Sequence, residues 1–255
     1  MQEIIFNIDS LDRKILYELD HNSRQSASQI SKKLRVHKNV INFRINRLIE
    51  KGVIRQFVTI ISPSVLGLIP CKIYLQLQNL TDEKQKSIIQ FIQKLPLYWA
   101  AKVSGRWDFI LGVLVKDIKE FGDIKNRVLE KFGEDITNKT ISILIEAPYY
   151  YREYLTEDKS KKMEIRYWLK ESRNEKLDYQ DIEILRLLAN NSREPIVEIS
   201  EKVKLTVKTV ISRIKSLEKS GIIADYRISL NLDKIGYRFF KCFISLKNAD
   251  KKRIN

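Results

Sequence analysis

Hydrophobic positions near both ends of the chain recur with the spacing of an α-helix, and the same pattern occurs twice. A constant offset of 169 residues aligns residues 9–67 with residues 178–236, with 17 identities over 59 positions and no insertion. In each copy, apolar residues three and four apart mark three successive short segments, which predicts three amphipathic helices. The repeating unit is as long as a domain, so a solenoid of short repeats is excluded.

The ends of the predicted helices carry residues typical of helix boundaries. The third helix ends at Gly52 in the first copy and at Gly221 in the second, and glycine is common just past a helix end. Ser26 caps the second helix of the first copy, and Pro195, tolerated in a first helical turn, takes its place in the second. Each glycine is followed by a run rich in β-branched and aromatic residues, which predicts a β-hairpin. Three helices and such a β-wing form the winged helix-turn-helix, which presents a helix to the DNA major groove.

The hydrophobic period changes in the stretch between the two copies. Alternating runs there predict strands, and runs with helical spacing predict helices, in the order βαββαβ. The predicted elements are a strand at 71–80, a helix at 82–95, two strands within 98–115 around a turn at 104–106, a helix at 117–133 and a strand at 139–147. This order is that of a ferredoxin-like sandwich, so the expected fold class is α+β. Such a sheet leaves edges that pair with another subunit.

The expected domain organisation follows from these patterns. The joint at 149–176 is rich in charges and tyrosines, and its part at 162–169 is expected to pack as a strand or arm. The expected domains are a winged helix-turn-helix at 1–62, a ferredoxin-like domain at 63–155, a linker or packed arm at 156–176, a second winged helix-turn-helix at 177–240 and the start of a truncated second ferredoxin-like domain at 241–255.

The charge of the chain indicates an anionic partner. Lysine and arginine number 47 against 32 aspartate and glutamate residues, a net charge of +15. The excess lies in the two copies, with +5 in residues 1–62 and +6 in 177–255 against +2 in 63–155. Such a balance favours nucleic acid or a membrane surface. Because no run of about 18 apolar residues and no signal-peptide pattern occurs, a cytoplasmic protein with no membrane partner is expected.

Cysteine and histidine are too few and too far apart for a disulfide framework or a metal site. Cys71 and Cys242 each lie in an apolar run and are expected to be buried thiols. His21 and His37 are the only histidines, and with the cysteines they fit no zinc spacing. Neither a metal nor a cofactor is therefore expected.

Several short motifs of the first copy and the middle domain occur together. They are LDRKIL at 11–16, NSR at 22–24, RI at 44–45, GVI at 52–54 and SGRWDF at 104–109. As a set they resemble the Lrp/AsnC, or feast/famine, family of transcription regulators, and SGRWDF is similar to that family's Gly-x-x-Asp hairpin. The resemblance implies a DNA-binding repressor or activator that responds to an amino acid or similar small molecule. It also implies that the domain at 63–155 is a ligand-sensing and oligomerisation domain, through which the protein forms a homodimer or higher homo-oligomer, and that the start of a second, truncated regulatory domain lies at 241–255. This chain departs from the family pattern by carrying two winged helices and one complete regulatory domain.

The third helix of each copy carries the candidate contacts to double-stranded DNA. If Ile41, Ile45 and Leu48 form the buried seam, the opposite and flanking side chains face outward. The candidate DNA-binding residues are Lys38, Asn39, Asn42, Phe43, Arg44, Asn46, Arg47, Lys208, Thr209, Ser212, Arg213 and Lys215. Asparagine can pair with adenine edges, and lysine can contact phosphate or guanine. The alternative is that these side chains only solvate an exposed helix. Because the two copies differ here, they are expected to recognise different base sequences.

Two pairs of arginines shared by the copies leave their roles open. Arg44 and Arg213 lie about 60° from the buried seam, so they either clamp a DNA phosphate or pair with a carboxylate such as Asp12 or Asp181. The structural pairing is favoured. For the pair Arg24 and Arg193, neither role is favoured.

The turn at 104–106 is the candidate effector site. Ser104 and the backbone amides near Gly105 can hold a carboxylate, and Asp108 can accept an ammonium group. The alternative is a plain β-turn in which Asp108 caps its own backbone.

Two other functions fit the same arrangement. An architectural DNA-binding protein would also be basic and oligomeric. Sirohaem decarboxylases resemble this two-domain arrangement. That resemblance implies histidines near the regulatory cleft, but the only two histidines of this chain, His21 and His37, lie in the first copy of the repeat and not in the middle domain. Because no phosphate loop, catalytic triad or pair of catalytic carboxylates is apparent, an enzyme is not expected. The expected function is sequence-specific transcription regulation that responds to a small molecule, an amino acid.

Overall fold

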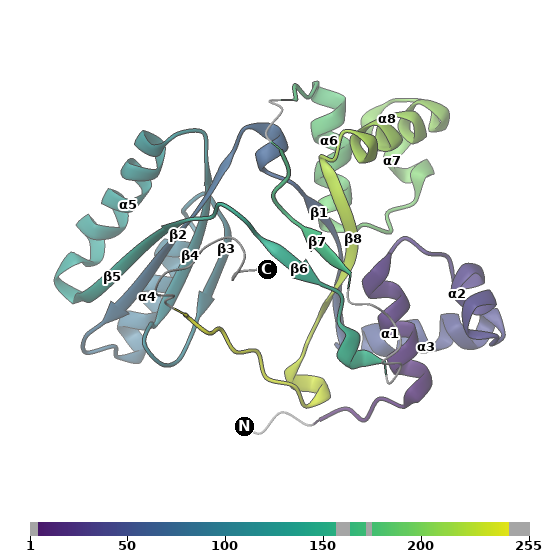
Figure 1. Cartoon of the computed structure of the whole chain (residues 1–255), viewed down its shortest axis with the longest axis horizontal. Helices are drawn as coiled ribbons and strands as arrows, with labels where there is room; N and C mark the ends of the chain where they lie inside the picture. Colours follow the sequence, from purple (N-terminus) through teal and green to yellow (C-terminus); the bar gives the residue numbers. More distant parts are fainter. Residues whose placement is uncertain (1–4, 157–163, 172–174, 245–255) are drawn as a thin grey trace, which may run out of the picture.

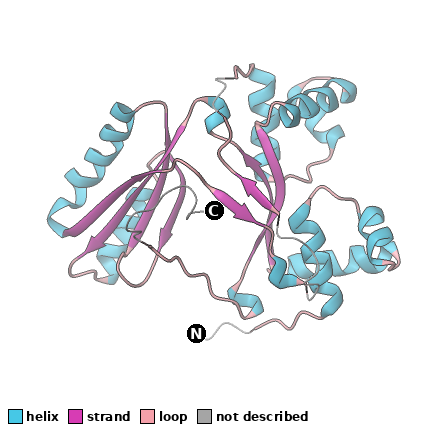
Figure 2. Cartoon of the chain, viewed as in Figure 1, coloured by secondary structure: helices cyan, strands magenta, loops and turns pink. Residues whose placement is uncertain are grey.

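A computed structural model describes residues 5–156, 164–171 and 175–244. Two groups of three helices lie at one side of the molecule and a four-stranded sheet with two helices lies at the other (Figure 1). Strands connect the two sides (Figure 2). The α+β class expected from the sequence is confirmed. Each copy of the repeat matches a winged helix-turn-helix unit, and the ferredoxin-like sheet is formed by the residues between the copies.

The helical groups are called here the first head and the second head. The first head contains α1 (Ser10–His21), α2 (Ala27–Leu34) and α3 (Lys38–Glu50), and the second contains α6 (Tyr179–Asn190), α7 (Ile196–Val203) and α8 (Val207–Lys219). Equivalent residues cap equivalent helices, because Asp9 accepts a hydrogen bond from the third amide of α1 and Asp178 does the same for α6. The helix boundaries therefore follow from local sequence in both copies.

The strand that follows each head pairs with its counterpart from the other copy. Strands β1 (Ile54–Ile61) and β8 (Ile223–Leu230) form an antiparallel two-stranded sheet. The prediction of a hairpin in each copy is thus wrong within the described residues. The physical reason is that β1 packs on α6 and β8 packs on α1, so each strand completes the apolar core of the opposite head. The hydroxyl of Thr59 on β1 also donates to the Leu188 carbonyl on α6 at 2.7 Å.

The regulatory sheet has the strand order β3-β4-β2-β5, with every neighbouring pair antiparallel. Its elements are β2 (Ile69–Leu77), α4 (Asp82–Ile92), β3 (Leu97–Lys102), β4 (Phe109–Val115), α5 (Ile118–Phe132) and β5 (Ile136–Ile143). Alternate residues of β2 and β4 pack against α4 and α5 in one apolar core. This is the βαββαβ arrangement that the sequence predicts.

The opposite face of the sheet carries a smaller apolar cluster of Tyr74, Trp107 and Ile110. The ammonium group of Lys241 donates to the Tyr74 hydroxyl at 3.0 Å, and the Phe243 ring meets the Tyr74 ring edge-on at 5.3 Å. The second of the cysteines expected to be buried, Cys242, is exposed, because this end of the chain lies along the sheet and not within it.

The joint between the sheet and the second head contains two short paired strands. Strands β6 (Pro148–Tyr150) and β7 (Ile165–Tyr167) are antiparallel, and the Trp168 indole donates to the Ile61 carbonyl of β1 at 2.7 Å. Two parts of the stretch expected to form a linker or arm, at 157–163 and 172–174, lie outside the described residues. So do residues 245–255 of the expected second regulatory domain, whose described part, 241–244, forms no strand.

Four short 3-10 turns complete the described elements. They are η1 (Ser64–Leu66), η2 (Gly133–Asp135), η3 (Glu153–Leu155) and η4 (Asp233–Ile235). No helix in the described part of the chain has the length and apolar character needed to span a bilayer. Among those same residues, histidine, cysteine and carboxylate side chains form no group suited to a metal ion.

Candidate nucleic-acid interface

The outward face of α3 is exposed to solvent, as the sequence geometry predicts. Ile41, Ile45 and Leu48 are at most 5% exposed and fix the helix on the first head. The side chains on the other side are exposed, and they are Lys38, Asn39, Asn42, Phe43 and Asn46. Phe43 is 66% exposed. The helix therefore presents amide, ammonium and aromatic groups on one accessible face.

The equivalent helix of the second head, α8, presents different chemistry. Val210, Ile214 and Leu217 form its buried seam. Lys208, Ser212 and Lys215 are exposed, and Ile211, in the position of Asn42, is 39% exposed. The half-buried Thr209 lies in the first turn of the helix, and its hydroxyl lies 2.8 Å from that of the capping residue Thr206.

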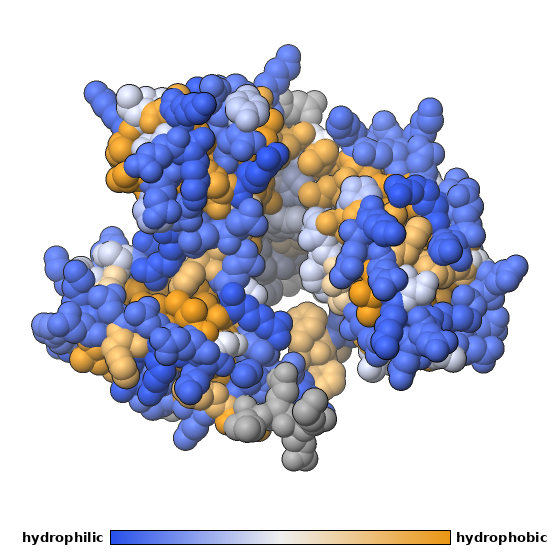
Figure 3. Space-filling model, turned by 180° about the vertical axis from the view of Figure 1, so that it is seen from behind, coloured by the Kyte–Doolittle hydropathy of each residue, from blue (hydrophilic) through white to orange (hydrophobic). Residues whose placement is uncertain are grey.

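On the face seen in Figure 3, hydrophilic side chains and apolar patches both lie at the surface of the heads. Among the exposed residues are Lys38 of α3 and Lys208 and Lys215 of α8, and lysine can contact phosphates while exposed amides reach base edges.

All three arginines of the candidate DNA-binding set already have carboxylate partners. Arg44 Nη1 lies 2.5 Å from Asp9 and 3.0 Å from Asp12, and Arg47 Nη2 lies 2.5 Å from Asp12. In the second head Arg213 lies 2.7 Å from Asp178 and 2.8 Å from Asp181. The structural role favoured for the shared arginines is therefore the one observed. Arg47, expected on the DNA-facing flank, belongs to the same ion-pair group.

These ion pairs hold the recognition helix of the first head on α1. Asp12 is fully buried, so its charge requires partners, and both guanidinium groups supply them. The hydrogen bond from Arg44 lowers the pKa of Asp9, which also caps α1. The orientation of α3 thus depends on two carboxylates at the start of α1.

Symmetric contacts join the two heads. The hydroxyl groups of Ser23 and Ser192, which are 169 positions apart, lie 2.6 Å from each other. Ser23 N–H donates to the Tyr226 carbonyl at 3.0 Å, and Ser192 N–H donates to the Phe57 carbonyl at 3.0 Å. Every partner in this set is the repeat equivalent of another, so a pseudo-twofold axis passes between the two serines.

The arginines whose role the sequence left open lie beside this axis. The Arg24 guanidinium stacks over the Tyr226 ring at 5.4 Å, and the Arg193 guanidinium stacks over the Phe57 ring at 5.0 Å. Arg24 also donates to the Ser192 carbonyl at 2.5 Å. Both arginines hold the heads together. The signal in the sequence was the repeated NSR motif together with an aromatic residue at the same place in each strand.

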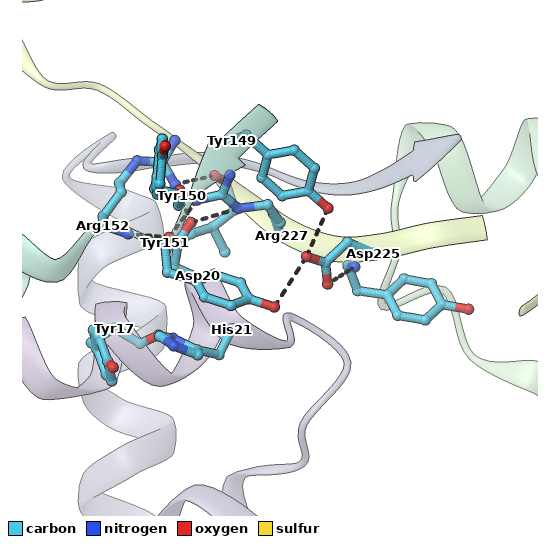
Figure 4. Close-up of polar contacts among 11 residues, drawn as sticks. Tyr17, Asp20, His21, Tyr149, Tyr150, Tyr151, Arg152, Asp225 and Arg227 are labelled. Atoms are coloured by element: carbon cyan, nitrogen blue, oxygen red, sulfur yellow. Dashed lines mark hydrogen bonds and ion pairs between the residues drawn. The ribbon is translucent and has the colours of Figure 1, made fainter. Parts of the chain in front are cut away.

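A buried polar cluster at the joint was not found from the sequence (Figure 4). The fully buried Asp20 accepts hydrogen bonds from the guanidinium groups of Arg152 and Arg227, and Arg227 Nη2 lies 2.6 Å from it. Nearby, the hydroxyls of Tyr149 and Tyr151 donate to Asp225 at 3.1 and 3.3 Å. The segment that leaves the regulatory sheet is thereby bound to α1 and to β8 together.

Burial determines the ionisation of this cluster. It raises the pKa of Asp225 above its usual range, and it raises the pKa of Tyr151 to about 12, with the Asp225 charge acting in the same direction. The tyrosines therefore remain hydrogen-bond donors at neutral pH. A signal was present in the repeat, because Asp20 and Asp225 occupy positions where the other copy has Ala189 and Gln56.

The candidate effector residues lie along one bend of the regulatory domain. Ser104 and Gly105 are exposed, and Gly105 has a φ of +119° with open space where a side chain would stand. Asp108 is half-buried, and its carboxylate accepts the Leu77 amide hydrogen at 2.8 Å. The carboxylate caps a backbone amide of β2, in a neighbouring strand, and not one of its own turn.

The chain is similar in sequence to winged helix-turn-helix transcriptional regulators. A family model described as winged helix-turn-helix DNA-binding matches residues 8–55 and 177–224. The HTH-type transcriptional regulator PH1916 of Pyrococcus horikoshii is 30% identical over 137 residues, which is 51% of this chain and 90% of that protein. The proline dehydrogenase transcriptional activator of Rhodobacter capsulatus is 32% identical over 126 residues, covering 48% of this chain and 80% of its own length.

Solved structures show the same fold. An AsnC family transcriptional regulator from Agrobacterium tumefaciens is 26% identical with a TM-score of 0.50, over 57% of this chain and 95% of that chain. The siroheme decarboxylase NirDL covers 87% of this chain and 66% of its own, with a TM-score of 0.57. At 13% identity, this second likeness is one of fold alone.

Proposed function

Because this chain belongs to the Lrp/AsnC family of DNA-binding transcription regulators, we propose that the outward faces of α3 and α8 contact DNA bases and that an amino acid controls the binding. The observation that carries the first part is the repeated pairing of a buried apolar seam with an exposed polar face on the third helix of each head.

The proposed contacts are the exposed members of the candidate set. On α3, Asn42 and Asn46 can each form paired hydrogen bonds with adenine, and Phe43 can contact a thymine methyl group. On α8, Lys208 and Lys215 can donate to guanine or to phosphate. The arginines paired with aspartates position the helices and are left out of the base-contacting set.

Selection of bound sequences from random DNA tests this proposal. Asn42→Ala together with Asn46→Ala is expected to remove base preference from part of the selected motif while the circular dichroism spectrum stays unchanged. A matched control is Gln90→Ala with Asn138→Ala, which removes two exposed amides from the regulatory domain. An unchanged motif in the first variant would contradict the proposed face. Tight binding by the wild-type chain without any motif would indicate an architectural DNA-binding protein.

The proposed effector site is the bend that contains Ser104, Gly105 and Asp108. The Asp108 carboxylate has acceptor capacity beyond its bond to Leu77, so it can receive an ammonium group. The open space at Gly105 leaves backbone amides accessible to a carboxylate. The name of the Rhodobacter relative connects that protein with proline dehydrogenase, an enzyme whose substrate is an amino acid.

Thermal-shift measurements with each of the twenty common amino acids test the effector proposal. One amino acid or a small chemical group of them is expected to raise the melting temperature and to change DNA affinity. Asp108→Asn keeps an oxygen for the Leu77 amide but removes the charge, so it should abolish the shift without unfolding the domain. Asp123→Asn, at an exposed position on α5, is the control. A shift that persists in Asp108→Asn would place the effector elsewhere.

Assembly into a homodimer or larger oligomer is also part of the proposal. Strand β5 lies at an edge of the sheet, where its backbone has β2 as a neighbour on one side, and Ile143 on it is 50% exposed. Exposed apolar edge strands pair readily with a second copy. Sedimentation equilibrium should show a mass above that of one chain, and Ile143→Lys should reduce it. A monomeric wild-type chain would contradict this part.

A further inference from the structure

We infer that one chain forms a complete DNA-recognition unit, and that its DNA site consists of two unlike half-sites in inverted orientation. The inference rests on the proposed function, because it requires both α3 and α8 to contact bases. It adds the composition, the orientation and the chain count of the site.

The first step is the symmetric pairing of the heads within one chain. In the β1–β8 sheet, Val58 pairs with Arg227, its own repeat equivalent, so the axis crosses the sheet at this pair. The residues on either side exchange accordingly, Phe57 with Ile228 and Thr59 with Tyr226. In an isologous pair, the same surface patch is used on both sides. The two copies of the repeat use the same patch on each other.

The contacts outside the sheet follow the same rule. Phe6 N–H donates to the Lys234 carbonyl at 2.7 Å, and Glu175 N–H donates to the Val65 carbonyl at 3.0 Å. These four residues are again two pairs of repeat equivalents. The symmetry therefore extends from the strands to the segments that precede both heads.

The second step is that neither head has a complete core without the other copy. The core of the first head includes Ile228, Leu230 and Ile235 from the second copy. The core of the second head includes Val65, with Ile61 packed against it, from the first copy. Separating the heads would expose apolar side chains on both. The pair therefore remains together in the chain that binds DNA.

The third step is that the symmetry ends at the outward face. Asn42, Phe43 and Asn46 of α3 correspond to Ile211, Ser212 and Lys215 of α8. Paired amide hydrogen bonds select adenine, whereas an ammonium group selects the oxygen and nitrogen acceptors of guanine. The same scaffold thus presents different chemistry to the two halves of the DNA site.

The geometry gives the orientation of the halves. Heads related by a twofold axis approach the duplex from opposite strand directions, which is why symmetric dimers bind inverted repeats. Here the half-sites are inverted in direction but unlike in sequence: adenine contacts under α3 and guanine contacts under α8. A site of this kind is bound in one orientation.

Random-sequence selection with the full chain and with two double variants tests the inference. The wild-type motif is expected to have two unlike halves. Asn42→Ala with Asn46→Ala should erase one half, and Lys208→Ala with Lys215→Ala should erase the other. A palindromic motif in which each double variant weakens both halves equally would overturn the inference and leave the proposed function intact. Loss of all sequence preference in the wild-type chain would overturn both.

Directed DNA cleavage tests orientation without altering the base-contacting residues. In a Cys242→Ser background, Glu50→Cys and Lys219→Cys place an iron chelate at repeat-equivalent, exposed ends of α3 and α8. Each chelate is expected to cut one side of the selected site, on opposite sides for the two variants. Equal cutting on both sides by either variant would overturn the inference. Titration of the selected DNA with the chain should give one chain per two-part site. The same ratio is expected if chains associate through their regulatory sheets, because each added chain brings its own pair of heads.

Discussion

Replacing Asp20 with alanine removes the carboxylate that accepts hydrogen bonds from both Arg152 and Arg227 at the joint. Asp20 is fully buried, while the two arginine side chains are 24% and 12% exposed. Removing one partner of a buried ion pair costs about 3–5 kcal/mol, because the remaining charge stays desolvated. Here the arginines keep other acceptors, the Ile228 carbonyl at 3.1 Å and the Tyr150 carbonyl at 3.1 Å. The expected loss is therefore at the lower end, about 3 kcal/mol.

The assay is thermal unfolding followed by circular dichroism at neutral pH. For a chain of this size, about 1 kcal/mol corresponds to roughly 2–4 °C, so Asp20→Ala should lower the melting temperature by about 6–12 °C. Asp20→Asn keeps an acceptor oxygen but no charge, so its melting temperature should lie between those of the wild type and Asp20→Ala.

The repeat provides a matched control for this experiment. In the other copy the positions of Asp20 and Arg227 are occupied by Ala189 and Val58, which form no ion pair. Asp20→Ala combined with Arg227→Val should therefore recover roughly half of the loss, since one of the two unpaired guanidinium groups is gone. A melting temperature for Asp20→Ala within about 2 °C of wild type would refute the reasoning.

Three further outcomes are expected. Gly112→Ala would place a methyl group 2.7 Å from the Tyr98 ring, so it should destabilise the chain by about 1–3 kcal/mol, with recovery when Tyr98→Ala is added; an unaffected melting temperature would contradict this. Burial raises the folded-state pKa of Asp225 above its unfolded value, so its contribution to stability is present at low pH and is lost as pH rises through the raised pKa. At neutral pH Asp225→Asn should therefore melt at or above the wild-type temperature. The difference between the two melting temperatures should shrink on acidification. Lys208→Ala should reduce the slope of log affinity against log salt by about 1 if the side chain neutralises a phosphate, and an unchanged slope in a filter-binding titration would assign it to bases or to solvent.

The local elements of this protein were determined by the sequence itself. Helical spacing and capping residues such as Asp9 and Ser26 act within a few positions, so they predict the helices of both heads. The seam of Ile41, Ile45 and Leu48 predicts which face of α3 is exposed for the same reason, because the helical period relates neighbours directly. The order of elements in the regulatory domain follows from similar short-range patterns.

Tertiary structure alone decided which segments pair across long distances. A strand that folds back as a hairpin and a strand that pairs with its repeat equivalent have the same alternation, so β1 and β8 gave no local sign of their exchange. The pairing of Arg47 with Asp12 and the meeting of Asp20 with Arg152 and Arg227 join residues 35, 132 and 207 positions apart. Such contacts depend on where whole elements pack, because a buried charge is stabilised by whichever opposite charge the fold brings to it.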